Sequence, residues 1–241
     1  MIYKIYPLMV FLIMSFGKDS YNTADLKKAP TVKNFAKAEK PSVDASIENV
    51  YYALNANNFS MPELKTFSEA LKGFYLLKER GIVQKNILTL IDFSLSSNVK
   101  RLWVIDMTTN TILFNSLVAH GRNTGEEFAS AFSNLNSSFK SSLGFYSTGE
   151  IYQGKHGASL RLDGLERGLN SNARERGVVM HGADYVSESF IRDHKRLGRS
   201  QGCPALPVEL TDEIIETIKD KSCLYIYHPS RSFTMEEKLI S

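Results

Sequence analysis

The feature that most constrains the fold is a series of short apolar runs, separated by polar turn residues, that begins near residue 86. Each run has the length and composition of a strand rather than of a helix. Thr108, Thr109 and Asn110 separate two of them and predict a hairpin turn. We expect strands at residues 87–91, 101–106, 111–119, 144–153, 159–162, 177–180 and 222–227. The chain from residue 86 to about 230 is therefore predicted to be one mainly β domain.

Helices are expected at both ends of this pattern. Apolar residues recur at helical spacing between the capping-box pair Ser60 and Glu63 and the stop signal Gly81. A shorter helix is expected over residues 47–54, and a helix capped by Thr211 is expected to run to residue 219. Residues 128–142 are rich in Ser and Asn and are predicted to form a long loop. The overall class is α+β, with residues 46–85 as a helical N-terminal addition.

The N-terminus has the pattern of a secretory signal. Lys4 precedes an almost wholly apolar run over residues 5–16, and Ser15 and Gly17 are the small residues that precede a cleavage site. The run is too short to span a bilayer comfortably, because spanning takes about 20 residues. We predict a signal peptide at 1–17, a flexible linker at 18–45 and a C-terminal tail at 231–241. A retained anchor is the alternative, and it would be the chain's only contact with the membrane. The predicted location is outside the cytoplasm, in the periplasm or cell envelope.

The overall charge argues against one function class. A formal net charge of +3, with mostly scattered basic residues, does not predict a nucleic-acid-binding protein. The histidines show no spacing typical of a zinc site, and no metal is predicted.

The two cysteines lie in different surroundings. Cys223 is part of an apolar run typical of a buried strand, where Cys acts as a small hydrophobic residue. Cys203 lies between Gly202 and Pro204 in a polar turn that would display its thiol. A Cys203–Cys223 disulfide is the structural alternative for an exported chain. The contrast favours Cys203 as a nucleophile, which acts as thiolate and needs a neighbouring base.

His181 is the predicted base, because it ends an apolar run and is followed by Gly182. A backbone carbonyl near Gly182 could set the tautomer of its imidazole. The amides of Gly202 and Cys203 are the expected oxyanion donors. His120 also follows a strand and is the competing candidate for the base.

Further residues are candidates for binding substrate, each with a structural alternative. Arg199 has a planar fork suited to a carboxylate, but a salt bridge is equally expected. Tyr152 could stack on substrate or lie in the core, and Ser200 could hydrogen-bond within the turn. Gln201 and His156 are placed on the substrate side, whereas His194 is expected to be solvated and His228 structural.

Residues 177–183, which contain His181-Gly182, and residues 198–205, which contain Ser200-Gln201-Gly202-Cys203-Pro204-Ala205, together resemble the murein L,D-transpeptidase catalytic domain family. Cys203 follows His181 by 22 positions. Residues 159–166, 172–176 and 197–207 resemble a variant branch of that family. Gln201 stands where the commoner pattern has a second histidine, which puts substrate choice and the balance of transfer and hydrolysis in doubt.

The resemblance implies a β-sandwich or barrel with Cys203 as nucleophile and His181 as base. It also implies that Cys203 forms a thioester with a peptidoglycan stem peptide, with no metal or organic cofactor, and that an amine resolves it. Hydrolysis by the same cysteine, as in an L,D-carboxypeptidase, is one alternative. A non-catalytic envelope-binding module is another. The acyl acceptor and the oligomeric state stay open.

Overall fold

The computed structural model describes residues 43–231. The predicted signal peptide, most of the predicted linker and nearly all of the predicted C-terminal tail lie outside the described residues. The division into segments therefore stays a prediction. No helix among residues 43–231 is both long enough and apolar enough to cross a membrane.

Two helices precede the sheet, as predicted. They are α1 (Val43–Tyr52) and α2 (Leu64–Glu79). Gly81 follows the end of α2 with φ +71°, which is the conformation that its stop signal predicts. The predicted capping box is wrong. Glu63 is the N-cap residue and makes no side-chain cap, while the hydroxyl of Ser60 donates to Asn115 Oδ1 at 2.9 Å, so it serves a contact with the sheet instead.

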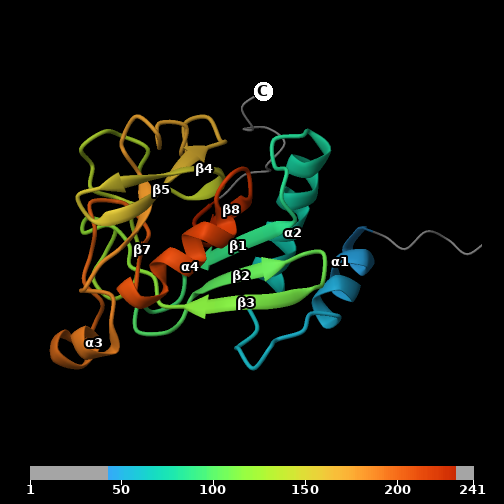
Figure 1. Ribbon diagram of the computed structural model, residues 1–241, viewed down its shortest axis with the longest axis horizontal. Coiled ribbons are helices and arrows are strands. Elements are labelled where there is room, and N and C mark those ends of the chain that lie inside the picture. Colours follow the sequence, from blue (N-terminus) through green and yellow to red (C-terminus); the bar gives the residue numbers. More distant parts are fainter. Residues whose placement is uncertain (1–42, 232–241) are drawn as a thin grey trace, which may run out of the picture. The chain divides into compact units, whose positions relative to one another are not determined.

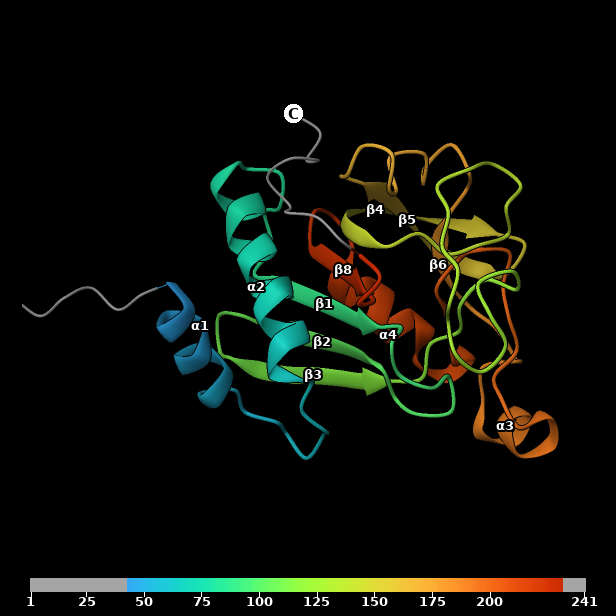
Figure 2. The same ribbon diagram turned by 180° about the vertical axis from the view of Figure 1, so that it is seen from behind.

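The seven predicted strands and one short strand that was not predicted, β7, form a single eight-stranded sheet in the order β3-β2-β1-β8-β4-β5-β6-β7. The β1–β8 and β6–β7 pairs are parallel, and the remaining pairs are antiparallel. Figures 1 and 2 show the two sides of this sheet. The strands are β1 (Ile87–Asp92), β2 (Leu102–Asp106), β3 (Thr111–Ser116), β4 (Gly144–Gly154), β5 (Gly157–Gly164), β6 (Val179–Gly182), β7 (Ala205–Leu206) and β8 (Cys223–Tyr227).

The two ends of the sheet approach each other. The segment that follows β3 forms an antiparallel bridge between Ala119 and Ala205 of β7, and a second bridge joins Gly121 to Ser200. The sheet is therefore nearly closed into a barrel, which removes most of its exposed edges. This arrangement confirms the expected mainly β, barrel-like fold with helices added before it.

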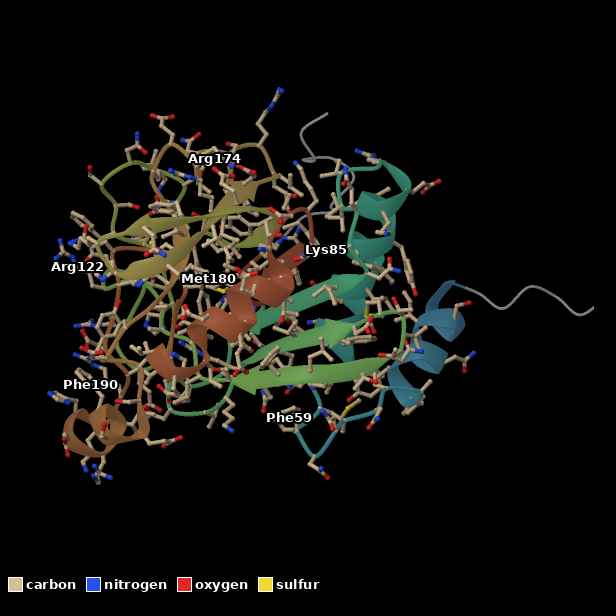
Figure 3. All side chains as sticks on the ribbon, viewed as in Figure 1. Phe59, Lys85, Arg122, Arg174, Met180 and Phe190 are labelled. Carbon is tan, nitrogen blue, oxygen red and sulfur yellow. The ribbon has the colours of Figure 1, made fainter. Side chains whose placement is uncertain are left out.

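Helices cover both faces of the sheet and create two apolar cores. On one face α2 lies against the sheet, as Figure 2 shows from that side, and its Phe67 and Leu71 belong to one apolar cluster with Phe145 of β4. On the other face α4 (Val208–Ile218) packs against β6, where Met180, labelled in Figure 3, lies in the same apolar cluster as Ile214.

Apart from the unpredicted strand β7, two features of the C-terminal third differ from the sequence prediction. Helix α4 begins after Pro207, and Thr211 lies inside the helix, where its hydroxyl donates to the Pro207 carbonyl at 2.8 Å. Thr211 is therefore not the cap, because a serine or threonine within a helix commonly bonds the carbonyl four residues before it. A short helix, α3 (Glu188–His194), was not predicted; the Ser187 hydroxyl caps it by accepting from the Phe190 amide.

The fully buried Arg101 side chain holds in place the segment that follows β3 and bridges to β7. The Arg101 guanidinium donates to the Val118 carbonyl from Nε and Nη2, to the Leu95 carbonyl from Nη1, and to His120 Nδ1 at 2.8 Å. Burial lowers the Arg101 pKa to about 9, and the charge of Asp92 opposes that shift. Arg101 thus stays charged at neutral pH and ties the β1–β2 connection to the segment that meets β7.

Replacing Arg101 with leucine is expected to destabilise the fold strongly. The change leaves buried carbonyls and a buried ring nitrogen without their donor, and breaking such an arrangement costs roughly 3 to 5 kcal/mol. Urea unfolding of Arg101→Leu measures the loss. The control is Arg192→Leu on α3, an exposed side chain that pairs only loosely with Asp193, for which we expect a change within about 0.5 kcal/mol. Equal stability of the two variants would contradict the structural role of Arg101.

Candidate active site

Strand β6 carries His181 between two neighbouring strands. His181 pairs with Ser159 of β5 on one side and with Ala205 of β7 on the other. The sequence placed His181 just after a strand, whereas the strand includes it. Because both flanking strands hold its backbone, the position of the imidazole is set by the sheet itself.

Hydrogen bonding fixes the orientation of the His181 ring. The side chain is only 4% exposed, and Nδ1 lies 2.8 Å from the carbonyl oxygen of Gly182. A carbonyl can only accept, so Nδ1 carries the hydrogen and Nε2 keeps its lone pair. Burial is the main cause that lowers the His181 pKa from its ordinary value. The ring is therefore neutral at pH 7 and able to take up a proton at Nε2.

The turn that bears Cys203 is held by Ser200. The buried Ser200 hydroxyl donates to the Cys203 carbonyl at 2.6 Å and accepts from the Gly202 amide at 3.0 Å. Gly202 has φ +122°, and a Cβ there would lie 2.8 Å from the Lys140 carbonyl oxygen. Only glycine fits this turn. Ser200 thus makes the turn contacts that were one of its predicted roles.

The Cys203 thiol lies beside the backbone of β6. Its sulfur is 3.5 Å from the Val179 amide nitrogen, which donates to it, and 3.7 Å from the Gly177 carbonyl oxygen. In the parallel β6–β7 register His181 is opposite Ala205, so Cys203 continues that register opposite Val179. Residues two apart on a strand face the same way. Val179 and His181 therefore share the strand face that the thiol approaches.

Burial sets the resting charge of the thiol. It raises the Cys203 pKa above the ordinary value, while the Val179 hydrogen bond and the charge of Arg176 oppose that shift. The thiol is therefore protonated at pH 7. With the thiol protonated and the imidazole neutral, His181 can accept a proton as a general base.

A cleft of about 570 Å³ brings the predicted side chains together. Cys203 and His181 both line it, as do the five predicted substrate-side residues Tyr152, His156, Arg199, Ser200 and Gln201. Ser137, Phe139 and residues 176–179 complete much of its wall. Seven positions that span some fifty residues of sequence thus meet at one surface.

Not all of the backbone groups predicted for the oxyanion hole are free to donate to a substrate oxygen. The Gly202 amide donates to Ser200, so it does not face the cleft as expected. No acceptor is recorded for the Cys203 amide among residues 43–231. Gly182 contributes its carbonyl, which holds His181. The Cys203 amide is therefore the remaining donor of the predicted pair.

Both arginines that line the cleft bind oxygen atoms of the protein itself. Arg199 forms an ion pair with Glu126 at 2.6 Å and also donates to the Arg122 and Gly125 carbonyls, so the salt-bridge alternative holds for it. Arg176 was not singled out in the sequence. Its guanidinium donates to the Ser133 carbonyl at 2.8 Å and to the loop oxygens of Ser138, Lys140 and Ser142. The available signals were its position just before the strand of His181 and its place in residues 172–176, which resemble the variant branch.

The remaining histidines lie outside this cleft. His120 is buried, accepts from Arg101 at Nδ1 and lies 3.3 Å from the Gly125 carbonyl through Nε2. Burial and the charge of Arg101 lower its pKa to about 4. His120 is thus a structural residue, and the competing assignment of the base is wrong. His194 stacks on Phe190, and His228 hydrogen-bonds Ser230.

Neither a disulfide nor a metal cluster is found in the described part of the chain. Cys223 is fully buried in β8, whereas Cys203 is partly exposed, and both thiols are free. Among residues 43–231 no three His, Cys, Asp or Glu side chains are grouped as metal ligands would be.

Comparison with known proteins gives a family match. The family model described as L,D-transpeptidase catalytic domain matches residues 60–227. A comparison with curated proteins gave no match. The solved structures similar to the chain include an L,D-transpeptidase from Mycobacterium smegmatis, with 11% identity, a TM-score of 0.37 and coverage of 59% of each chain.

Two further structures give similar values. The helical cell shape determining protein Pgp2 from Campylobacter jejuni has 16% identity and a TM-score of 0.39, over 64% of this chain and 54% of that one. An L,D-transpeptidase from Xylanimonas cellulosilytica has 10% identity and a TM-score of 0.36, over 78% and 94%. The chain spans somewhat over half the length of the Mycobacterium and Campylobacter structures.

The family match covers more than half of the chain. It includes strands β6 and β7, together with His181 and Cys203. The protein belongs to the L,D-transpeptidase catalytic domain family.

Proposed function

We propose that the protein is a cysteine-dependent L,D-transpeptidase acting on peptidoglycan stem peptides. The observation that carries the proposal is the shared cleft of Cys203 and His181, in which the Gly182 carbonyl leaves Nε2 of His181 free to accept a proton. A thiol and an oriented base in one cleft form the minimal set for acyl transfer.

The proposed reaction moves one proton between Cys203 and His181 in each half. His181 Nε2 takes the thiol proton as the sulfur attacks the carbonyl carbon of an L,D peptide bond. The negative charge on the carbonyl oxygen falls next to the Cys203 amide. The C–N bond then breaks, the His181 proton goes to the departing amine of the terminal D-residue, and a thioester is left on Cys203.

The second half reverses the proton path. An acceptor amine attacks the thioester carbon and gives its proton to His181. The C–S bond breaks, and His181 returns the proton to the sulfur. If water takes the place of the amine, the same residues perform hydrolysis, so transfer and carboxypeptidase activity differ only in which nucleophile enters the cleft.

The charge of the cleft suits a substrate that bears carboxylates. Its lining includes the cations Lys155, Arg176 and Arg199 and contains no Asp or Glu. Arg199 is neutralised by Glu126, and Arg176 is engaged by loop oxygens. Lys155 makes no recorded ion pair within residues 43–231, so its charge is available to an anionic group. A stem peptide ends in a carboxylate next to the bond that would be cut.

The proposal extends to the location and organisation of the chain. Peptidoglycan lies outside the cytoplasm, so an enzyme of this kind has to be exported, which agrees with the predicted signal peptide at residues 1–17. A free Cys203 thiol is compatible with that location because Cys223 is buried in β8 and is not joined to it.

Incubation with tetrapeptide-stem muropeptides tests the function. We expect mass spectrometry to find a dimer joined by a 3-3 crosslink, with loss of one terminal D-residue for each bond formed. Cys203→Ala should abolish this product, because the nucleophile is gone. Cys223→Ala is the matched control and should retain activity, since that thiol is buried away from the cleft.

Other products would change the assignment. Loss of the terminal D-residue without a dimer would indicate hydrolysis. No reaction of the wild-type chain, together with no thioester adduct on Cys203, would contradict the proposed enzyme and favour a binding module.

The pH dependence of alkylation by iodoacetamide tests the neutral resting state. Below its pKa a thiol gains about tenfold in thiolate per pH unit. Because burial raises the Cys203 pKa, the rate is expected to keep rising through pH 8 and past 9. Cys203→Ala should not react, which checks that Cys223 is shielded. A plateau already reached below pH 7 would instead indicate a preformed thiolate–imidazolium pair.

Reversal of the charge at Lys155 is expected to weaken substrate binding. Loss of one partly exposed charge contact is worth about 1 kcal/mol, so KM of Lys155→Glu should rise about fivefold or more. KM is measured by steady-state kinetics at pH 8. At that pH His181 is neutral, so the substitution does not change the protonation state of the base. Lys85→Glu is the control, because Lys85 lies away from the cleft beside the start of β1 (Figure 3). An unchanged KM would exclude Lys155 from substrate binding.

A further inference from the structure

The tip of the β4–β5 hairpin places a second imidazole on the His181 base. Gly154 ends β4, and Gly157, which has φ +79°, begins β5. The chain therefore reverses direction at Lys155 and His156. The His156 ring stacks on the His181 ring with centroids 4.4 Å apart and an angle of 19° between the planes. His156 is otherwise exposed and makes no recorded hydrogen bond within residues 43–231.

This stack determines which face of His181 meets solvent. Nδ1 of His181 is held by the Gly182 carbonyl, and the backbone of His181 is paired with β5 on one side and β7 on the other. The hairpin tip then covers one face of the imidazole, and His181 lines the same cleft as Cys203. An aromatic ring stacked at this separation restricts tilting of its neighbour.

We propose that His156 is a positioning residue that holds the His181 ring in its reactive orientation and disfavours a proton on it before substrate arrives. This inference rests on the proposed role of His181 as the base. His156 itself touches no reacting atom. It acts through the ring that it covers and through its own charge when it is protonated.

Two physical effects of the stack act in the same direction. The covering ring removes water from His181, which disfavours the charged form, and a proton on His156 repels a proton on His181. Lower solvation and this repulsion both contribute to the lowered His181 pKa, while the Gly182 carbonyl opposes it. The base therefore stays neutral, and able to accept a proton, in more acidic solution than an ordinary histidine.

The other groups that face His181 are few. Lys155 comes from the same hairpin and adds a repulsion of the same sign. Cys203, from the turn before β7, and Tyr185, from the loop after β6, line the cleft as well. Burial raises the pKa values of both Cys203 and Tyr185, that of Tyr185 to about 12, so both are uncharged near pH 6. Among these groups, only His156 stacks on the His181 ring.

The test is a titration of His181 followed by NMR of the full chain with labelled histidine side chains, assigned with His181→Gln. In His156→Phe the stack is kept but the second charge is removed, and a phenyl face also favours a cation. The His181 pKa is therefore expected to rise by about half to one pH unit. The acidic limb of kcat/KM should move upward by the same amount.

The matched control is His194→Phe. His194 is also exposed and also stacks on an aromatic ring, that of Phe190 at 3.9 Å, but it lies on α3, apart from the β4–β5 hairpin (Figures 1 and 3). Its replacement should leave the His181 titration unchanged. His156→Ala, which loses the cover as well as the charge, should also lower kcat at pH 8 by about threefold or more.

An unchanged His181 pKa in His156→Phe would overturn the proposal. The NMR titration needs no turnover, so it decides the role of His156 even if no muropeptide reacts. Failure of the proposed function would appear separately, as an inactive wild-type chain. A shift in His181 of equal size in His194→Phe would also overturn the proposal, because the effect would then not depend on the stack.

Discussion

The closing contact between the segment after β3 and the segment before β7 is the constraint on which the site depends. Ala119 pairs with Ala205, Gly121 with Ser200, and the Ser200 amide donates to the His120 carbonyl at 3.0 Å. The buried Arg101 guanidinium holds the segment after β3 in place by donating hydrogen bonds to the Val118 carbonyl and the His120 ring. Because Cys203 lies inside the stretch held in this way, closure of the barrel also sets the position of the Cys203 thiol.

The chemistry of the cleft follows from burial more than from charge pairing. Both key groups lose hydration, so the thiol pKa rises and the His181 pKa falls, and each is neutral at rest. In the proposed reaction the proton passes from the thiol to His181 as the sulfur attacks a substrate carbonyl. Two of the cations around the pair hold the structure: Arg176 donates to the carbonyls of Ser133 and Lys140, and Arg199 pairs with Glu126.

Much of the fold was predictable because strand patterns are local. The runs that became β1, β2, β4, β5 and β8 carry their own periodicity and turn residues, and Gly81 ends α2 as expected. The predicted helix caps were wrong where a polar side chain had more than one possible hydrogen-bond partner. Ser60 bonds Asn115 across the sheet, and Thr211 bonds Pro207, so neither caps a helix. The two-residue strand β7 has no pattern of its own, because it exists only through its pairing with β6 and Ala119.

For the candidate site, the sequence alone determined which residues have the right chemistry and local conformation. It separated Cys203, in a glycine turn, from Cys223, in an apolar strand, and it placed His181 before a glycine at the end of a strand. Only the tertiary structure decided that His120 is buried against Arg101, that Arg199 is occupied by Glu126, and that His156 covers His181. The physical reason is that burial and hydrogen-bond partners belong to groups far apart in the chain, and those partners set the charge and orientation of each side chain.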